Sequence, residues 1–179
     1  MDVSNPASPT DVRRVTATAS AGVAVGSRLY TAEGTNGVRV YDISQPDNPT
    51  LVNTINAVSN IGRVAASNGR LYALRSYGPP LQLHIFALTD PNTPSLVGTY
   101  STERVAGLAA LGDLVFLSGY ERGTEVVNVA NPSAPSRVRV LPYYYVQNAD
   151  ASSGFALIQG QSILMLYNPS SGQERRTEL

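Results

Sequence analysis

The chain has 179 residues, of which 42% are hydrophobic and 15% charged, and its formal net charge is zero. A neutral chain lacks the basic surface that attracts nucleic acid or anionic membranes, so neither is an expected partner. The absence of cysteine and lysine excludes disulfides, thiolate nucleophiles, Schiff bases and a phosphate-loop lysine. No apolar run approaches the roughly 18 residues that a membrane helix needs, so no membrane insertion is expected.

A short phrase containing prolines recurs along the chain and indicates a repeat architecture. Its copies occupy residues 2–9, 42–49, 87–94 and 128–135, with a shortened copy at 165–169. The first prolines of these copies lie 40, 45, 41 and 37 residues apart. Because proline cannot donate to a strand ladder, two prolines three residues apart end one strand and fix the following turn. We therefore interpret the phrase as turn chemistry and not as a binding site.

Between phrases, the same four short strands are predicted in each repeat, and no segment has the 3.6-residue period of a helix. The first strands are predicted at 22–25, 64–67, 108–111 and 149–152, each followed by a turn containing glycine. The second strands are predicted at 28–31, 70–74, 113–117 and 155–158. The third strands are predicted at 38–43, 81–88, 125–129 and 162–166, and the fourth at 51–55, 96–100 and 137–141.

The composition of these strands favours a β-propeller of four-stranded antiparallel blades. First strands are rich in alanine, glycine and valine, which suits strands crowded around a common axis. Third strands are apolar on both faces, as in Val40-Tyr41 and Ile85-Phe86, which suits sheets packed between neighbouring sheets. A single β-sandwich ranks second because it would show cleaner alternation. The whole chain, 1–179, is predicted to be one domain, with repeats at about 16–55, 56–100, 101–141 and 142–179.

The repeat resembles the LVIVD-repeat β-propeller family. The resemblance rests on the string Gly-Val-Arg-Val-Tyr-Asp-Ile-Ser-Gln-Pro-Asp-Asn-Pro-Thr-Leu-Val at 37–52 and on residues 91–98. It covers nearly the whole chain, strongly in the first two copies and weakly in the last. The resemblance implies a propeller fold and a bacterial or archaeal surface or secreted protein, and it supplies no catalytic residues.

The last repeat departs from the pattern, which raises the question of how the ring closes. After Pro169 the sequence turns charged, so a fourth strand is not evident there. Residues 10–15 follow the first phrase in the register of a fourth strand. We predict a four-bladed ring in which the N-terminal segment, 1–15, supplies the outer strand of the last blade and removes exposed sheet edges. The alternatives are an open fragment of a longer protein, since the chain starts inside a phrase, and an oligomeric ring.

Few residues suit chemistry near the axis. His84 is the only histidine, so a histidine-rich metal site is excluded, and neither a metal nor a cofactor is predicted. Its equivalents in the other repeats are taken as Arg39, Glu125 and Ser162. Asp150 stands where other first strands have Ala24, Ala65 and Ala109, with Asn148 and Arg63 near the mouth of the same strands. This trio indicates either a water-filled channel or a site for a polar ligand or cation.

Tyrosine and arginine gather in the loops that a propeller places on one face. The candidate binding residues there are Arg75, Tyr77, Tyr120, Arg122, Tyr143, Tyr144 and Tyr145. Tyrosine and arginine are typical of recognition surfaces because they combine a large contact area with hydrogen-bonding tips. The alternative is that these tyrosines cover blade edges.

The sequence therefore predicts a non-enzymatic recognition module that binds a protein or glycan through its loop face. Its localisation, extracellular or at the cell surface, is implied by the family resemblance. A hydrolase or lyase that uses carboxylates at the central channel is one alternative, because paired carboxylates can cleave glycosides. A structural repeat segment of a larger surface protein is the other.

Overall fold

The computed structural model describes residues 7, 18–104, 106–119, 122–141, 148–152, 154–159 and 163–178. Within these residues the fold is all-β, with four antiparallel four-stranded sheets and no helix. None of the described segments forms a helix with the length and hydropathy of a membrane span.

Each sheet is built from four strands that follow one another in the chain. Sheet 1 consists of β1 (Ala21–Val25), β2 (Arg28–Ala32), β3 (Val38–Asp42) and β4 (Thr50–Ile55). Sheet 2 consists of β5 (Ile61–Ser67), β6 (Arg70–Arg75), β7 (Gln82–Ala87) and β8 (Ser95–Ser101). Sheet 3 consists of β9 (Gly107–Leu111), β10 (Leu114–Gly119), β11 (Gly123–Asn128) and β12 (Ser136–Leu141). Sheet 4 consists of β13 (Asn148–Ser152), β14 (Phe155–Gln159), β15 (Ile163–Asn168) and β16 (Gln173–Glu178).

The first hairpin of every sheet turns on a glycine in the left-handed region. Gly26, Gly69, Gly112 and Gly154 have φ values of 56°, 69°, 57° and 82°. Tight hairpins need such positive φ values, which glycine adopts without steric cost. The predicted glycine turns are confirmed, and they set the register of the two inner strands of each sheet.

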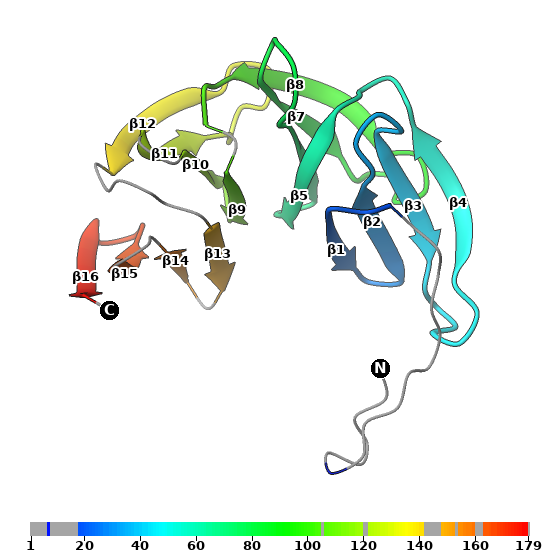
Figure 1. Ribbon diagram of the computed structural model, residues 1–179, viewed down its shortest axis with the longest axis horizontal. Coiled ribbons are helices and arrows are strands. Elements are labelled where there is room, and N and C mark those ends of the chain that lie inside the picture. The colour runs from blue at the N-terminus through cyan, green and yellow to red at the C-terminus, as the bar shows by residue number, and fades with distance from the viewer. Residues whose placement is uncertain are drawn as a thin grey trace.

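The four sheets follow one another around an arc with their first strands innermost (Figure 1). Neighbouring first strands β1, β5, β9 and β13 contact one another in this order. The arc is open between sheet 4 and sheet 1, as the same view shows.

Three apolar cores hold the sheets face to face, one between each pair of consecutive sheets. We call the side of a sheet that faces the next sheet its forward face, and the opposite side its rear face. On the forward faces, Tyr30, Tyr72 and Phe116 occupy the same register position and are fully buried. Rear-face residues such as Leu71 pack against them from the following sheet. The predicted burial of both sheet faces is confirmed for sheets 2 and 3.

The proline phrase turns the chain and also accepts hydrogen bonds from the preceding sheet. Tyr30 donates its hydroxyl to the Pro91 carbonyl at 2.8 Å. Arg28 Nε donates to Asn92 Oδ1 at 2.6 Å, and Asn53 Nδ2 donates to the Asn92 carbonyl at 2.9 Å. All three donors belong to sheet 1, while the phrase belongs to sheet 2. The turn therefore fixes the spacing between adjacent sheets as well as the direction of the strand.

The last repeat supplies its own fourth strand, which the sequence analysis did not foresee. β16 pairs antiparallel with β15 from Ile163↔Glu178 to Asn168↔Gln173. Asn168 accepts from the backbone N–H of Ser170, and Gly172 has a φ of 69°, so a tight turn reverses the chain before a charged edge strand. The fourth position of sheet 4 is thus already filled, and residues 1–15 are not needed there. Residues 10–15 themselves lie outside the described residues.

Gly98 marks the closest approach between a sheet and the next proline turn. A Cβ built on Gly98 would lie 1.7 Å from the carbonyl oxygen of Pro132, which is backbone and has little room to move. We predict that Gly98→Ala destabilises the fold by about 1–3 kcal/mol. Thermal unfolding followed by circular dichroism should then show a Tm that is lower by roughly 2–4 °C for each kcal/mol.

Gly22→Ala is the matched control, because a Cβ there meets its nearest atom at 3.5 Å, an ordinary contact. We expect its Tm to stay close to that of the wild type. Equal Tm values for Gly98→Ala and Gly22→Ala would contradict the close approach of sheets 2 and 3.

Candidate functional site

One end of the sheets gathers the connections that join second to third strands and one sheet to the next. Gly34 pairs with Ile61, and the backbone N–H of Ser76 donates to the carbonyl of Asn60 at 3.0 Å. The N–H of Ala106 donates to the carbonyl of Ser118 at 2.8 Å. We call this end, with residues 33–37, 56–61, 75–81, 102–104 and 122, the loop end.

Three of the sequence-predicted loop residues lie at this end. Tyr77 is 59% exposed, and its ring edge lies beside Gly62, where a Cβ would come within 3.2 Å of Cε2. Arg75 ends β6 and donates to the Pro79 carbonyl at 3.4 Å. The Arg122 side chain is 62% exposed and precedes β11. The predicted residues Tyr120, Tyr143, Tyr144 and Tyr145 lie outside the described residues.

The predicted axial residues lie on first strands. Arg63 in β5 is partly buried and donates to the Gly62 carbonyl at 2.9 Å. Asn148 and Asp150 lie in β13, where the structure describes their backbone only. Asp150 pairs with Leu157, so its register matches that of Ala65 and Ala109.

The equivalent residue of Asp150 in sheet 1 is Val23, which pairs with Tyr30, and not the predicted Ala24. A one-residue slip of this kind arises because short strands of small residues carry little register information.

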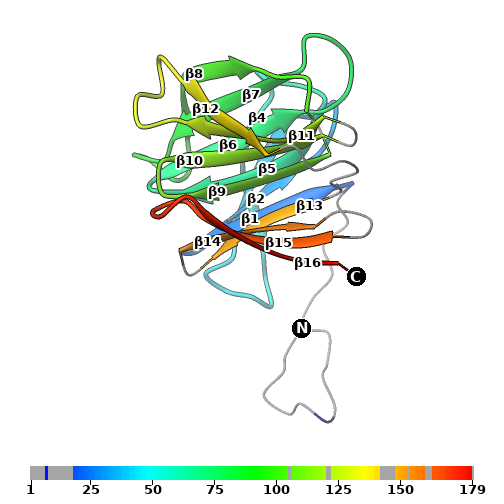
Figure 2. The same ribbon diagram turned by 90° about the vertical axis from the view of Figure 1, so that its left-hand side faces the viewer.

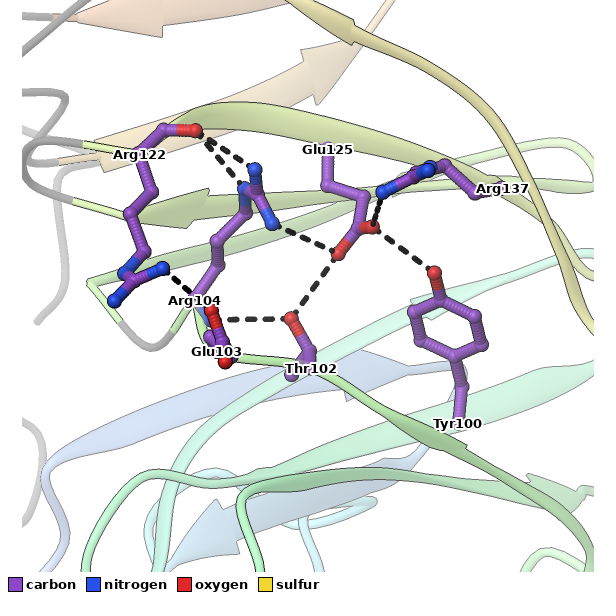
Figure 3. Close-up of polar contacts among 7 residues, drawn as sticks. All are labelled: Tyr100, Thr102, Glu103, Arg104, Arg122, Glu125 and Arg137. Atoms are coloured by element: carbon purple, nitrogen blue, oxygen red, sulfur yellow. Dashed lines mark hydrogen bonds and ion pairs between the residues drawn. The ribbon is translucent and has the colours of Figure 1, made fainter.

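A buried carboxylate near the loop end gathers polar groups from sheets 2 and 3 (Figure 3). Glu125 in β11 is 3% exposed. It accepts from the Tyr100 hydroxyl at 3.0 Å and from Thr102 Oγ1 at 3.2 Å. Arg104 Nη1 lies 3.5 Å from one carboxylate oxygen, and Arg137 Nη1 lies 3.7 Å from the other. We call these five residues the Glu125 cluster.

The cluster extends to the surface through a second ion pair. Arg104 Nε and Nη2 donate to the carbonyl of Arg122 at 3.1 and 2.9 Å. Arg122 in turn pairs with Glu103, and both of these side chains are mostly exposed. A shallow polar depression of about 290 Å³ lies over Tyr100, Arg104, Glu125 and their neighbours.

The neighbours of Glu125 fix the position of its carboxylate. Both carboxylate oxygens contact hydroxyl or guanidinium groups. Burial, followed by the hydrogen bond to Glu125, raises the pKa of Tyr100 to about 12, so this phenol stays a donor at neutral pH. The depression is lined by two arginines, Arg104 and Arg137, and two glutamates, Glu103 and Glu125.

His84 lies on the rear face of sheet 2 and shows no sign of a catalytic arrangement. It is 8% exposed, and neither ring nitrogen has a hydrogen-bond partner. Burial, and then the charge of Arg75, lower the pKa of His84. Among the described residues no group of three or more histidines, cysteines or carboxylates is arranged to hold a metal ion.

Sequence reasoning missed the Glu125 cluster. Its members come from β8, β11, β12 and the connection after β8, so no motif of neighbouring residues in the sequence predicts them. The available signal for the cluster was a polar third-strand position. Arg39, His84 and Glu125 were taken as equivalent at this position, and the strand registers confirm their equivalence. In sheet 4 this position holds Met165 and not the predicted Ser162.

Comparison with protein families settles the nature of the repeat. Residues 1–17 and 22–57 match the LVIVD repeat. These two segments carry the LVIVD repeat. The predicted resemblance is therefore confirmed over them, and it agrees with four successive sheets of four strands.

Solved structures share the arrangement of sheets at low sequence identity. The computationally designed Ika4 protein aligns with a TM-score of 0.64 and 9% identity, covering 94% of this chain and 96% of that one. A 6-phosphogluconolactonase candidate from Bacteroides uniformis aligns at 0.69 with 13% identity, over 88% of this chain and 52% of its own. A chain of a mitotic checkpoint complex aligns at 0.65 with 16% identity, over 86% and 48%.

These likenesses concern the propeller-type fold alone. The LVIVD-repeat chain spans about half the length of the latter two proteins. No sequence among curated proteins matches it.

Removing the buried carboxylate should damage the LVIVD-repeat fold. Glu125→Ala leaves Arg104, Thr102 and Tyr100 without their acceptor in a buried place. Breaking a buried ion pair on one side costs about 3–5 kcal/mol, so urea unfolding should show a loss of this order. The matched control is Glu103→Ala, which removes an exposed pair and should cost at most about 1 kcal/mol. A similar loss in both variants would show that Glu125 is not the centre of the cluster.

The stability of the protein should depend on pH through His84. The pKa of His84 is lower in the folded state than in the unfolded chain, so unfolding takes up a proton. Stability should therefore be constant well above an unfolded pKa of about 6.5 and fall as the pH drops below it. The slope contributed by one group is at most about 1.4 kcal/mol per pH unit.

Urea unfolding between pH 8 and pH 5.5 measures this slope, and His84→Gln is the comparison because glutamine does not titrate. The variant should lose the dependence. Parallel curves for the two proteins would assign the pH effect to another group.

Proposed function

We propose that this chain is a β-propeller-type recognition module of a secreted or cell-surface protein, and that its loop end binds a protein or glycan ligand. The observation that carries the proposal is the coincidence of Tyr77, Arg122 and the polar depression of the Glu125 cluster at the loop end. Tyr77 offers an exposed ring, and Arg122 offers a guanidinium group whose side chain is mostly in solvent. Such residues supply much of the binding energy in known interfaces.

The chemistry of the depression favours an acidic or hydroxyl-rich group on the ligand. The Arg137 side chain is 59% exposed, so part of its guanidinium remains accessible beside Glu125. Arginine forms strong, directional hydrogen bonds with carboxylates, and tyrosine rings stack on sugars and peptides alike. The alternative of a carboxylate-dependent hydrolase or lyase places its site at the central channel and stays a prediction.

The extracellular setting is supported by the resemblance to LVIVD-repeat surface proteins. The four-bladed ring closed through residues 10–15 stays a prediction. The filled fourth position of sheet 4 makes this form of closure less favourable than one in which further sheets complete the ring.

A double variant, Tyr77→Ala with Arg122→Ala, tests the loop end. On arrays of glycans and peptides that include acidic members, the wild type should bind a subset of ligands. The double variant should lose about tenfold or more in affinity, because truncation of a central aromatic or arginine contact costs more than 1 kcal/mol. Both side chains are exposed, so circular dichroism and the Tm should remain unchanged.

The matched control is Leu51→Ala with Leu96→Ala, which removes two exposed side chains on the outer strands. This variant should bind as the wild type does. Equal binding by all three proteins would place the ligand site elsewhere, and hydrolysis of an array ligand would favour an enzyme.

A further inference from the structure

Sheet 4 exposes on its forward face positions that are buried in the other three sheets. On the second strand, the side chains at one register position are fully buried in sheets 1 to 3, whereas the equivalent Leu157 is 36% exposed. The third strand repeats the contrast, because the equivalent Leu166 is 43% exposed. Phe155 adds a third exposed apolar side chain on this face. The buried equivalents are Tyr30, Tyr72 and Phe116 for Leu157, and Val40, Ile85 and Val126 for Leu166.

The exposed positions form one hollowed surface. A depression of about 320 Å³ is lined by Phe155, Leu166, Asn168, Gln173 and Arg175. The opposite face of sheet 4 packs on sheet 3 (Figure 2). The other exposed large apolar side chains of the described residues are spread over β1, β4, β8, β12 and the loop at Tyr77. An apolar surface with a polar rim, as on sheet 4, is typical of an interaction site.

The rear face of sheet 1, at the other end of the arc, is not a free surface of this kind. Thr31 and Tyr41 are buried there and donate to the carboxylate of Glu33 at 3.1 and 3.2 Å. Arg39 pairs with the same carboxylate at 3.0 Å. Among the described residues, the apolar face that a second copy can offer to sheet 4 is therefore its own sheet 4.

One row across the forward face of sheet 4 begins and ends with opposite charges. The strand registers place Asp150, Leu157, Leu166 and Arg175 side by side, in this order from β13 to β16. Residues directly opposite each other in an antiparallel pair share a face of the sheet. Asp150 therefore stands at the inner edge of the face and Arg175, which is exposed, at the outer edge, with two leucines between them.

This row is complementary to itself about a twofold axis that runs parallel to the strands. Rotation about such an axis lays β16 of one copy over β13 of the other, so that Arg175 of each copy faces Asp150 of the other and Leu157 faces Leu166. An axis across the strands would lay β16 over β16 and bring like charges together. Sheets packed face to face lie about 10 Å apart with their strands nearly aligned, which allows side chains of the two sheets to meet.

We propose that two copies of this chain form a symmetric dimer through the forward faces of sheet 4, with Arg175 of each copy paired to Asp150 of the other. The dimer covers the three exposed apolar side chains of each copy with those of its partner. Dimers with one twofold axis, in which both copies use the same surface, are the commonest protein oligomers. The proposal also gives a role to Asp150, because the equivalent residues of the other sheets are Val23, Ala65 and Ala109.

The symmetry of the dimer has a consequence for the loop end. Rotation about an axis parallel to the strands leaves the strand direction unchanged, so the loop ends of both copies face the same side. The dimer itself does not depend on the proposed function. Where that function holds, two ligand sites engage one surface together, which raises the overall affinity without any new contact.

Sedimentation velocity of the whole chain at micromolar concentrations tests the apolar contact. The wild type should sediment as a dimer. Leu157→Glu should raise the dimer dissociation constant at least tenfold, because dimerisation would bury an unpaired carboxylate. The matched control, Leu96→Glu, changes a side chain that is more exposed, at 53%, but lies on an outer strand of sheet 2, and it should leave the dimer intact.

Charge reversal on β16 tests the orientation of the two sheets. Arg175→Asp places an aspartate opposite Asp150 at both contacts of the dimer, so its dissociation constant should rise at least tenfold. Arg176→Asp is the matched control, because Arg176 is also exposed but pairs with Met165, which packs on sheet 3. The control should dimerise as the wild type does.

The reciprocal variant, Asp150→Arg, identifies the partner of Arg175. Alone it places two arginines at each contact and should also dissociate at least tenfold more readily. Mixed in equal amounts with Arg175→Asp, it should form a heterodimer, because one contact is then native and the other is its reversed copy. A chain that carries both substitutions should dimerise again by itself. Circular dichroism checks that each variant is folded.

A monomeric wild type would overturn the proposal and would mean that another partner covers sheet 4. Assembly beyond a dimer would also overturn it, because a symmetric contact of this kind closes with two copies. So would a dimer that persists in Leu157→Glu, or folded charge variants that do not recover on mixing. If Asp150→Arg does not fold, equal dissociation of Arg175→Asp and Arg176→Asp is the result that overturns the pairing.

Discussion

The packing of one sheet on the face of the next is the interaction on which the rest of the structure depends. At each junction a large forward-face side chain, such as Tyr30 or Phe116, is buried against apolar residues of the following sheet. Burying a side chain of this size contributes about 1.5–3 kcal/mol, and every junction repeats the contact. Between sheets 1 and 2, the carbonyls of the proline turn also accept hydrogen bonds from side chains of the preceding sheet. The apolar packing recurs at each of the three junctions, so the architecture is largely the sum of nearest-neighbour contacts.

The Glu125 cluster depends on the same junctions. Tyr100 and Thr102 come from sheet 2 or its exit, whereas Glu125 and Arg137 come from sheet 3, so the carboxylate is satisfied only when the two sheets are in contact. The cluster thereby connects the stability of the junction to the geometry of the loop end. Gly119 permits this arrangement, because a Cβ there would lie 2.8 Å from Cγ of Arg104.

The sequence predicted the fold well because its signals are local and repeated. Glycine turns, proline phrases and runs of Val, Leu and Tyr fix each strand to within a few residues, although register was mispredicted at Ala24 and Ser162. Prediction was weaker where a feature does not repeat along the chain or joins residues that are far apart in the sequence. β16 was missed because its charged residues suit an edge strand but resemble a solvated tail. The Glu125 cluster was missed because register, and not spacing along the chain, brings together Tyr100, Glu125 and Arg137. Of the predicted loop-end residues, the structure describes Arg75, Tyr77 and Arg122.

Repetition also explains why the two ends of the arc differ from its middle. A repeat that buries both of its faces needs a neighbour on each side, and a linear series of such repeats always leaves one forward and one rear face unmatched. Here the unmatched forward face keeps apolar side chains at Leu157 and Leu166, where a terminal cap would be expected to carry polar ones. Most of the charged residues of sheet 4 lie at its edge, on β16, where they protect the strand from pairing but leave the face itself uncovered. The sequence of sheet 4 is therefore that of an internal repeat, and its face is suited to another sheet of the same kind.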